Sequence, residues 1–271
     1  YWGVFCRKRP FANYYYWGLL LLIVPYYYSL IKNSPKSNAL TFLHWIVPIS
    51  IVIAFGTTSK GNGYFTTLAY FCLFNFFYLL GNLPAFSLES RLGNGYIKIG
   101  SIGMIFMLFG LSFSDSWSEL TRDESYFENI FQANTFWASI ALIVSCGVLF
   151  FRKIQQQGIR EIKPKEPTFL LIAILFLVGL GFSTIPVVLV NIFILGLGII
   201  TTKMGADRED LPSMNYGMLI ISALIICRFL DSDLDFVIRG IGFILLGAGF
   251  FATNYWMMKR KKKDDLHELP K

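Results

Sequence analysis

Charged residues are scarce in this sequence. Only 15% of the 271 residues are Asp, Glu, Lys or Arg, whereas 55% are hydrophobic. Soluble globular domains carry roughly 25% charged residues. A chain of this composition, with a mean hydropathy of +0.54, lacks the polar surface of an ordinary soluble domain, and the sequence therefore indicates a membrane protein.

Histidine is scarcer still, and the common motifs of catalysis are missing. The two histidines are His44 and His267, and His267 lies in the C-terminal tail, so a histidine-based metal site is not expected. The sequence contains no G-x-S-x-G, no Walker loop and no H-E-x-x-H, which are local signatures of hydrolases, nucleotide-binding proteins and zinc proteases. We expect no metal and no cofactor, and we expect a role other than catalysis.

Cysteine is also rare, and its spacing excludes a disulfide or zinc framework. The four cysteines are Cys6, Cys72, Cys146 and Cys227, with no C-x-x-C pair among them. Three of the four lie inside apolar runs. We interpret them as small buried apolar side chains.

Long apolar segments make up most of the chain. A membrane-spanning helix needs about 20 mostly apolar residues, and nine segments approach that length. They are 14–31, 39–55, 64–80, 96–114, 133–151, 168–182, 186–202, 214–230 and 236–257. The sequence thus predicts an all-α, polytopic transmembrane helix bundle of about nine spans. It forms a single integral membrane domain over residues 1–271, and we expect a further segment upstream of Tyr1.

One apolar stretch is too long for a single span. Residues 168–202 are interrupted by Ser183-Thr184-Ile185-Pro186. A tight hairpin of two short helices fits this pattern, and a re-entrant pair buried among other helices is the alternative.

The positive charges indicate membrane orientation and not nucleic-acid binding. The net charge is +7, and the excess lies in short loops and in the tail Lys259-Arg260-Lys261-Lys262-Lys263. A basic cluster after an apolar helix is the usual cytoplasmic flank of a span. With the C-terminus placed in the cytoplasm, most of the remaining basic residues also fall inside. Those inside are Lys32, Lys36, Arg91, Lys98, Arg152, Lys153, Arg160, Lys163, Lys165, Lys203 and Arg208. The group Arg7, Lys8 and Arg9 falls outside and disagrees with the assignment.

The densest charge constellation beside the apolar core is the predicted hairpin between the last two spans. Its members are Arg228, Asp231, Asp233, Asp235 and Arg239. Arg228 and Asp231 are three residues apart, and Asp235 and Arg239 are four apart, so each pair shares a helix face. An ionisable side chain near lipid is costly unless it is paired. We interpret the group as an ion-pair latch. The alternatives are an anion or headgroup site and a simple interfacial flank.

Small residues follow Arg239 along the last predicted span. Such residues let helix backbones approach closely in lipid. We predict a packing face that meets another helix of the chain or of a partner. Its members are Gly240, Gly242, Gly247, Ala248 and Ala252.

A few polar side chains lie within the predicted spans. Asn75 and Asn191 are expected to form interhelical hydrogen bonds. His44 is a candidate for proton transfer, and a satisfied core histidine is the alternative. Together, His44, Asn75 and Asn191 form a possible intramembrane polar site.

The last two predicted spans carry a recognisable pattern. Asn215-Tyr216-Gly217 is followed by Arg228-Phe229-x-Asp231-x-Asp233-Leu234 and by Arg239-Gly240-x-x-Phe243-x-x-x-Gly247. This pattern resembles a large bacterial family of integral membrane proteins classed as a domain of unknown function. Members of that family are often encoded beside small proteins named for a GDYxxLxY motif. The match covers about the last 45 residues. It implies a bacterial inner-membrane protein with an important C-terminal hairpin, and it supplies no reaction.

Three functional hypotheses follow from the sequence. The first is a non-enzymatic scaffold or accessory subunit of an envelope complex, with another membrane protein or a second copy of the chain as partner. The second is a transporter or channel for a small solute or lipid, because broken segments such as 168–202 can line a binding site. The third is an enzyme acting on a lipid-linked substrate.

Overall fold

The computed structural model describes residues 12–34, 37–59, 63–86, 93–121, 130–158, 162–182 and 184–231, with scattered positions between 237 and 259. Every regular element in these residues is helical, and none of them forms a strand. The predicted all-α fold class is therefore confirmed.

Eight of the predicted segments correspond to helices of similar length or position. The α-helices are α1 (Ala12–Asn33), α2 (Asn38–Thr58), α3 (Gly63–Gly81), α4 (Gly95–Leu111), α5 (Ser114–Thr121), α6 (Asn134–Gln157), α7 (Thr168–Gly179), α8 (Thr184–Asp207) and α9 (Leu211–Asp231). The short 3-10 helices η1 (Pro84–Phe86) and η3 (Ile130–Gln132) lie in connections. The helix α5 is an additional short element after α4.

The helix ends follow local chemistry. Ser37 caps α2 by accepting a hydrogen bond of 3.2 Å from the Leu40 amide, which satisfies one of the free donors of the first turn. Gly158 ends α6 with a φ of 79°, a left-handed conformation that costs glycine little. Pro186 lies in the first turn of α8, where its missing N–H is tolerated. Helix α8 can therefore begin at Thr184, before the proline. It also continues to Asp207, beyond the predicted span, whereas α7 is short.

The chain divides into two compact units. Unit 1 contains Tyr1–Met107 and Ser118–Ser183, and unit 2 contains Leu108–Trp117 and Thr184–Lys271. The single integral membrane domain over residues 1–271 stays a prediction.

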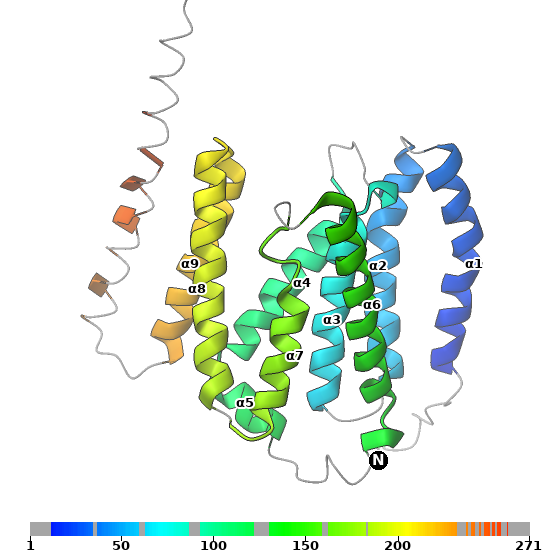
Figure 1. Ribbon diagram of the computed structural model, residues 1–271, viewed down its shortest axis with the longest axis horizontal. Helices are drawn as coiled ribbons and strands as arrows, with labels where there is room; N and C mark the ends of the chain where they lie inside the picture. The colour runs from blue at the N-terminus through cyan, green and yellow to red at the C-terminus, as the bar shows by residue number, and fades with distance from the viewer. Residues whose placement is uncertain are drawn as a thin grey trace, which may run out of the picture. The chain divides into compact units, whose positions relative to one another are not determined.

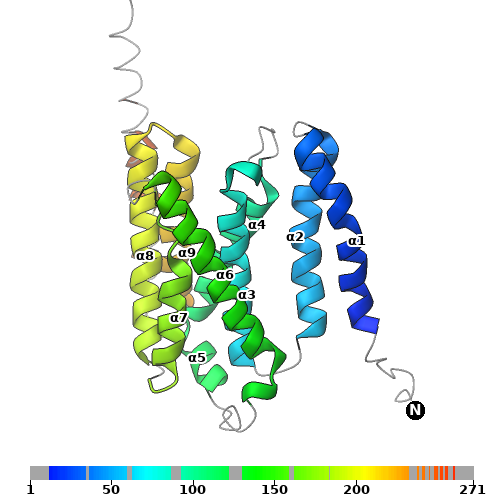
Figure 2. The same ribbon diagram turned by 45° about the vertical axis from the view of Figure 1, so that its right-hand side comes forward.

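Helix α3 is the centre of unit 1. It lies beside α6 and α7 and also touches α2 (Figures 1 and 2). Large aromatic side chains of α3 fill the core, and Phe71 and Phe77 are almost completely buried. Tyr64 donates a hydrogen bond to the Phe176 carbonyl of α7, and Ser139 of α6 donates one of 3.0 Å to the Phe65 carbonyl. Aromatic packing and polar bonds therefore hold α3 in place together.

In unit 2, α8 and α9 pack along each other with little side-chain volume between them (Figure 1). A Cβ added to Gly217 would fall 2.8 Å from the Gly198 carbonyl oxygen, and one added to Gly205 would fall 2.7 Å from the Met214 Cα. Real Cβ atoms do not come this close. The glycines thus permit a backbone-to-backbone contact, as in other closely packed membrane helices.

The helices establish a multi-pass membrane protein but do not confirm nine spans. Five are long and apolar enough to cross a bilayer: α2, α3, α6, α8 and residues Leu211–Phe229 of α9. The pair α4 and α5 adds a sixth if its 87° bend is counted within one span. Helix α1 contains six tyrosines among 22 residues, which lowers its hydropathy. Helix α7 has only 12 residues, about 18 Å of helix, and the predicted span 236–257 lies mostly outside the described residues.

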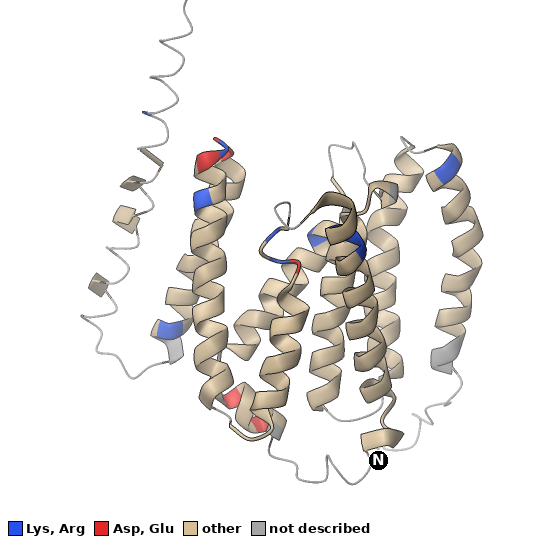
Figure 3. Ribbon diagram, viewed as in Figure 1, with Lys and Arg blue, Asp and Glu red and all other residues tan. Residues whose placement is uncertain are grey.

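Charge and apolar surface are arranged as a bilayer requires. Exposed apolar side chains occur along the described spans, for example Leu22 of α1, Val144 of α6 and Ile192 of α8. Within unit 1, Lys and Arg lie near the end of the bundle where α1 and α6 finish and α4 begins (Figure 3). The described basic residues of unit 1 thus share an end of this unit. Which side of the membrane that end faces stays a prediction.

Candidate functional site

The predicted charge cluster of the C-terminal hairpin is only partly described. Arg228 lies in the last turn of α9. Its Nη2 donates a hydrogen bond of 3.2 Å to the Ser112 hydroxyl, and its guanidinium carbon lies 4.8 Å from the centre of the Phe113 ring. Asp231 is the last residue of α9, and its side chain is not described. Asp233, Asp235, Arg239 and Gly242 lie outside the described residues, so the ion-pair latch stays a prediction.

The small residues of the last predicted span have no visible packing partner in the described part of the chain. Among the residues described, nothing lies within 4 Å of a Cβ built on Gly240 or Gly247. Ala248 and Ala252 are exposed. The prediction that this face meets a neighbour is untested.

His44 is enclosed by aromatic rings in unit 1. The rings of Tyr27, Phe86 and Tyr96 lie 5.5–5.9 Å from it, centre to centre, and none of its surface is exposed. Its Nδ1 lies 2.9 Å from the Leu40 carbonyl oxygen and 3.2 Å from the Tyr27 hydroxyl. Because a carbonyl can only accept, the Leu40 contact places the proton on Nδ1. The other nitrogen, Nε2, is then an unprotonated acceptor with no partner among the described residues.

Asn75, at the centre of α3, is also completely buried. Its amide nitrogen donates to the Met104 sulfur of α4 and to the Lys165 carbonyl, each at 3.1 Å. It therefore joins two spans and the α6–α7 connection.

Asn191 belongs to unit 2. Its amide donates to the Ser112 carbonyl at 3.0 Å and to the Val187 carbonyl at 2.7 Å. His44 and Asn75 belong to unit 1 and Asn191 to unit 2, so the possible intramembrane polar site stays a prediction.

The connection between α6 and α7 carries a cluster that the sequence analysis did not identify. Lys153, in the last two turns of α6, donates to Glu166 in a buried ion pair. Glu166 has no exposed surface, and Lys153 is 7% exposed. Two more lysines of this connection bind the neighbouring helix ends, Lys163 at the Asn82 side-chain oxygen and Lys165 at the Ser101 hydroxyl, each at 2.8 Å.

The electrostatics of this connection are unusual for a loop. A buried ion pair is costly to form and costly to break, because removal of one partner leaves an uncompensated charge in a region of low dielectric. Burial, together with the nearby positive charge of Lys98, lowers the pKa of Lys165 from near 10.5 to about 8. The Glu166 Oε2 has no hydrogen-bond partner in the part of the chain that the structure describes. The connection therefore holds a buried carboxylate and a destabilised ammonium at the ends of α3, α4 and α6.

The sequence contained a weak signal for this cluster. The run Lys163-Pro164-Lys165-Glu166-Pro167 combines charges with two prolines. The prolines stiffen the connection because they fix φ. Charges at the end of a span are normally solvated. The pattern gave no indication that two of them would be buried.

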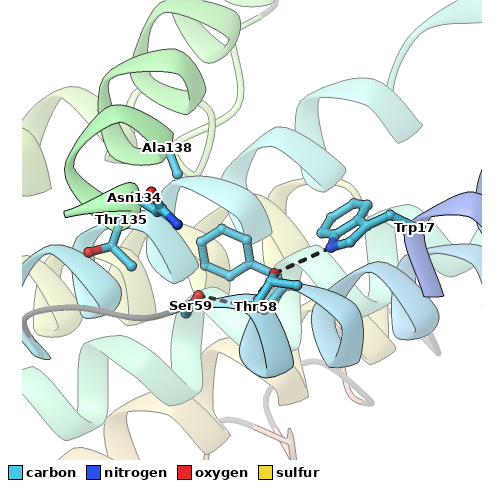
Figure 4. Close-up of a pocket in the computed structure, with 7 residues that line it drawn as sticks. Trp17, Thr58, Ser59, Asn134, Thr135 and Ala138 are labelled. Carbon is cyan, nitrogen blue, oxygen red and sulfur yellow. Dashed lines mark hydrogen bonds between the residues drawn. The ribbon is translucent and has the colours of Figure 1, made fainter. Parts of the chain in front are cut away.

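A pocket of about 310 Å³ lies in unit 1, between the N-terminal half of α1, the C-terminal end of α2 and the N-terminal turns of α6. Its lining residues combine aromatic, hydroxyl and amide side chains, and none is charged (Figure 4). They are Trp17, Phe55, Thr58, Ser59, Asn134, Thr135 and Ala138. These residues come from the opposite ends of α2 and α6 to those that carry His44 and Lys153.

The described residues contain no group of three or more His, Cys, Asp or Glu that could hold a metal ion. Cys72, Cys146 and Cys227 are free thiols, and Cys146 donates a hydrogen bond of 3.4 Å to the Cys72 carbonyl. Cys6 lies outside the described residues.

No protein-family model, curated protein or solved structure matches this sequence.

Proposed function

We propose that this protein is a non-enzymatic component of the bacterial cytoplasmic membrane, a scaffold or accessory subunit of an envelope complex. One observation carries the proposal: His44 and Asn75, the polar side chains best placed to line a path through unit 1, have no exposed surface. Asn75 is used to join helices, and His44 is enclosed by rings. These groups stabilise a packed bundle, as a structural component requires.

The resemblance of the C-terminal hairpin to a bacterial membrane family supports the same proposal. Family members are often encoded beside small membrane-associated proteins, which are natural candidates for a partner. Gly247 and Ala248 are exposed among the described residues, and this small-residue face provides a surface on which a helix of such a partner can pack closely.

Site-specific photo-crosslinking in native membranes tests the proposal. A photoreactive amino acid is introduced at Leu22, Val144 or Ile192, which expose 75%, 58% and 61% of their surface. We expect a discrete protein adduct from at least one of these positions, in which the partner and this chain occur in a constant ratio. The same reagent at Phe71, which has no exposed surface, is the control. Lipid adducts alone at every position, with a lone monomer after extraction in several mild detergents, would contradict the scaffold.

The alternative function, a transporter or channel for a small solute or lipid, makes a different prediction. It requires His44 or Asn75 to become accessible to water during transport. Single cysteines at these positions in a cysteine-free background would then react with a membrane-impermeant thiol reagent. We expect no reaction in the folded protein. Rapid labelling would contradict the scaffold hypothesis and favour the transporter hypothesis.

A further inference from the structure

The uncharged pocket of unit 1 has the chemistry of a lipid site. We propose that it binds the glycerol-ester region of a bilayer lipid, with the first part of an acyl chain along Phe55 and Trp17. This site is independent of the proposed scaffold function.

The walls of the pocket are fixed by internal hydrogen bonds. The Trp17 indole nitrogen donates to the Thr58 hydroxyl at 3.3 Å, which holds the ring across one side of the pocket (Figure 4). Thr58 in turn donates to the Ala54 carbonyl at 2.9 Å, and Ser59 donates to the Phe55 carbonyl at 2.7 Å. Each hydroxyl donates its hydrogen to a backbone carbonyl of α2, so each oxygen can still accept a further hydrogen bond.

Two groups on α6 have hydrogen-bonding capacity to spare. Asn134 is exposed, and its amide, which lines the pocket (Figure 4), offers both donors and an acceptor. Thr135 is only 1% exposed, and its hydroxyl has no partner among the described residues. Because the Thr135 oxygen is itself buried, Asn134 is the donor on α6 that a ligand carbonyl can reach.

The composition of the pocket selects the class of ligand. None of the lining residues carries a charge, so a phosphate or an ammonium group would find no direct counter-ion. The volume of about 310 Å³ lies at the small end of the range for small-molecule sites, roughly 300–1,000 Å³. The pocket therefore accommodates a segment of an amphiphile. Ester carbonyls that accept hydrogen bonds next to methylene groups match the mixture of amide, hydroxyl and aromatic side chains.

The surroundings point to the bilayer as the source. Leu21, one turn from Trp17 on the same face of α1, is 69% exposed. This side chain continues the apolar surface from Trp17 along the helix. Tryptophan is enriched at the depth where headgroups meet acyl chains, which is also the depth of the glycerol esters.

Photolabelling of the full chain in vesicles tests the site. The probe is a phosphatidylcholine with a diazirine on the first carbons of one acyl chain, and labelled peptides are mapped by mass spectrometry. We expect enrichment in the peptides that contain Trp17, Phe55–Ser59 and Asn134–Ala138. Labelling that follows exposed apolar area alone, without this enrichment, would overturn the proposal.

A pair of alanine substitutions on α6 provides a matched control. Ala138→Phe fills the pocket, whereas Ala141→Phe adds the same side chain at an exposed position outside it. We expect Ala138→Phe to abolish the enrichment and Ala141→Phe to leave it unchanged. Asn134→Ala, at an exposed position that tolerates truncation, should reduce the enrichment about fivefold if one hydrogen bond of about 1 kcal/mol is lost. Equal labelling in all three variants would contradict the site.

Two further probes define what is recognised. A phosphatidylglycerol probe with the same diazirine should give the same enrichment, because no charge lines the pocket. A photoreactive hydrocarbon without an ester should not be enriched. Equal enrichment of the hydrocarbon would show an apolar crevice without ester recognition, and strict preference for one headgroup would show a charged site elsewhere. Either result would overturn the proposal.

Discussion

The α3 core of unit 1 and the α8–α9 pair of unit 2 hold membrane helices together in different ways. Around α3, bulky rings such as Phe71 and Phe77 fill the space, and Asn75 crosses between elements by hydrogen bonds. Between α8 and α9, glycines remove the side chains so that backbones meet, as at Gly198 and Gly217.

The difference teaches how each region responds to substitution. In lipid there is no hydrophobic gain from burying leucine against leucine, so helix association depends on close packing and polar bonds. The α3 region relies on polar bonds and is sensitive to the loss of a partner. The α8–α9 pair relies on close approach and is sensitive to the addition of a methyl group.

The largest expected effect is at the buried ion pair. Glu166→Gln should lower the free energy of unfolding in detergent by about 3 kcal/mol, because it leaves Lys153 buried without a counter-charge. Replacement of both residues by methionine should cost much less, since a well-packed apolar pair often substitutes for a buried ion pair. Chemical unfolding of the two variants measures both values. Equal losses in the single and double variants would show that the pair does not couple.

The next effect tests the glycine contact. Gly217→Ala should lower the free energy of unfolding by about 1–3 kcal/mol, the usual cost of overpacking. Gly196 is on α8 with nothing within 4 Å of an added Cβ, so Gly196→Ala should be neutral or stabilising by about 0.5–1 kcal/mol. Thermal unfolding compares the two. A similar change in both variants would show that close approach at Gly217 does not limit the packing of α8 against α9.

A smaller effect is expected at Asn75. Asn75→Leu should cost about 1 kcal/mol, near the average for a hydrogen bond between membrane helices. The Lys165 carbonyl also accepts a hydrogen bond of 2.8 Å from the Thr168 hydroxyl, which limits the loss. Asn75→Leu combined with Thr168→Val leaves that carbonyl without either donor. The double variant should therefore lose more stability than the sum of the single variants, and simple additivity would argue against a shared acceptor.

The last expected effect is a pH dependence at Lys165. Its pKa is about 8 in the folded protein and near 10.5 ordinarily, so the unfolded chain binds more protons between these values. The free energy of unfolding should rise with pH across that window. Lys165→Met should therefore be more stable than the original protein at pH 7, and this advantage should shrink by pH 9.5. Lys32→Met, at an exposed position, is the control for general pH effects in the same unfolding measurements.

The sequence predicted the helices well because their signal is local. Apolar runs and breakers such as Pro186 are readable without knowledge of neighbours. The number of spans was less certain, because α1 is rich in tyrosine and α7 has only 12 residues. The count of nine spans did not take account of either property.

The contacts were harder to predict because they depend on which elements become neighbours. Gly217 was recognised as part of a pattern, yet nothing in the sequence indicated that it meets Thr202 and Gly198 of α8. Lys153 was counted only as a basic residue of the inner side and Glu166 was not singled out, because only the fold shows that both are buried. Asn75 was identified as a hydrogen-bonding residue, but its partners, the Met104 sulfur and a loop carbonyl, carry no sequence signal.

The ion pair at the end of α6 also separates two stages in the life of the chain. During insertion, positive charges near span ends direct orientation, whereas acidic residues contribute little. On the proposed orientation, Lys153 is one of the orientation signals while the helices enter the bilayer, and Glu166 contributes little to it. Once the chain folds, Glu166 neutralises Lys153 inside the core. On the proposed orientation, one lysine first guides biogenesis and then becomes part of the structure that prevents the helices from reorienting.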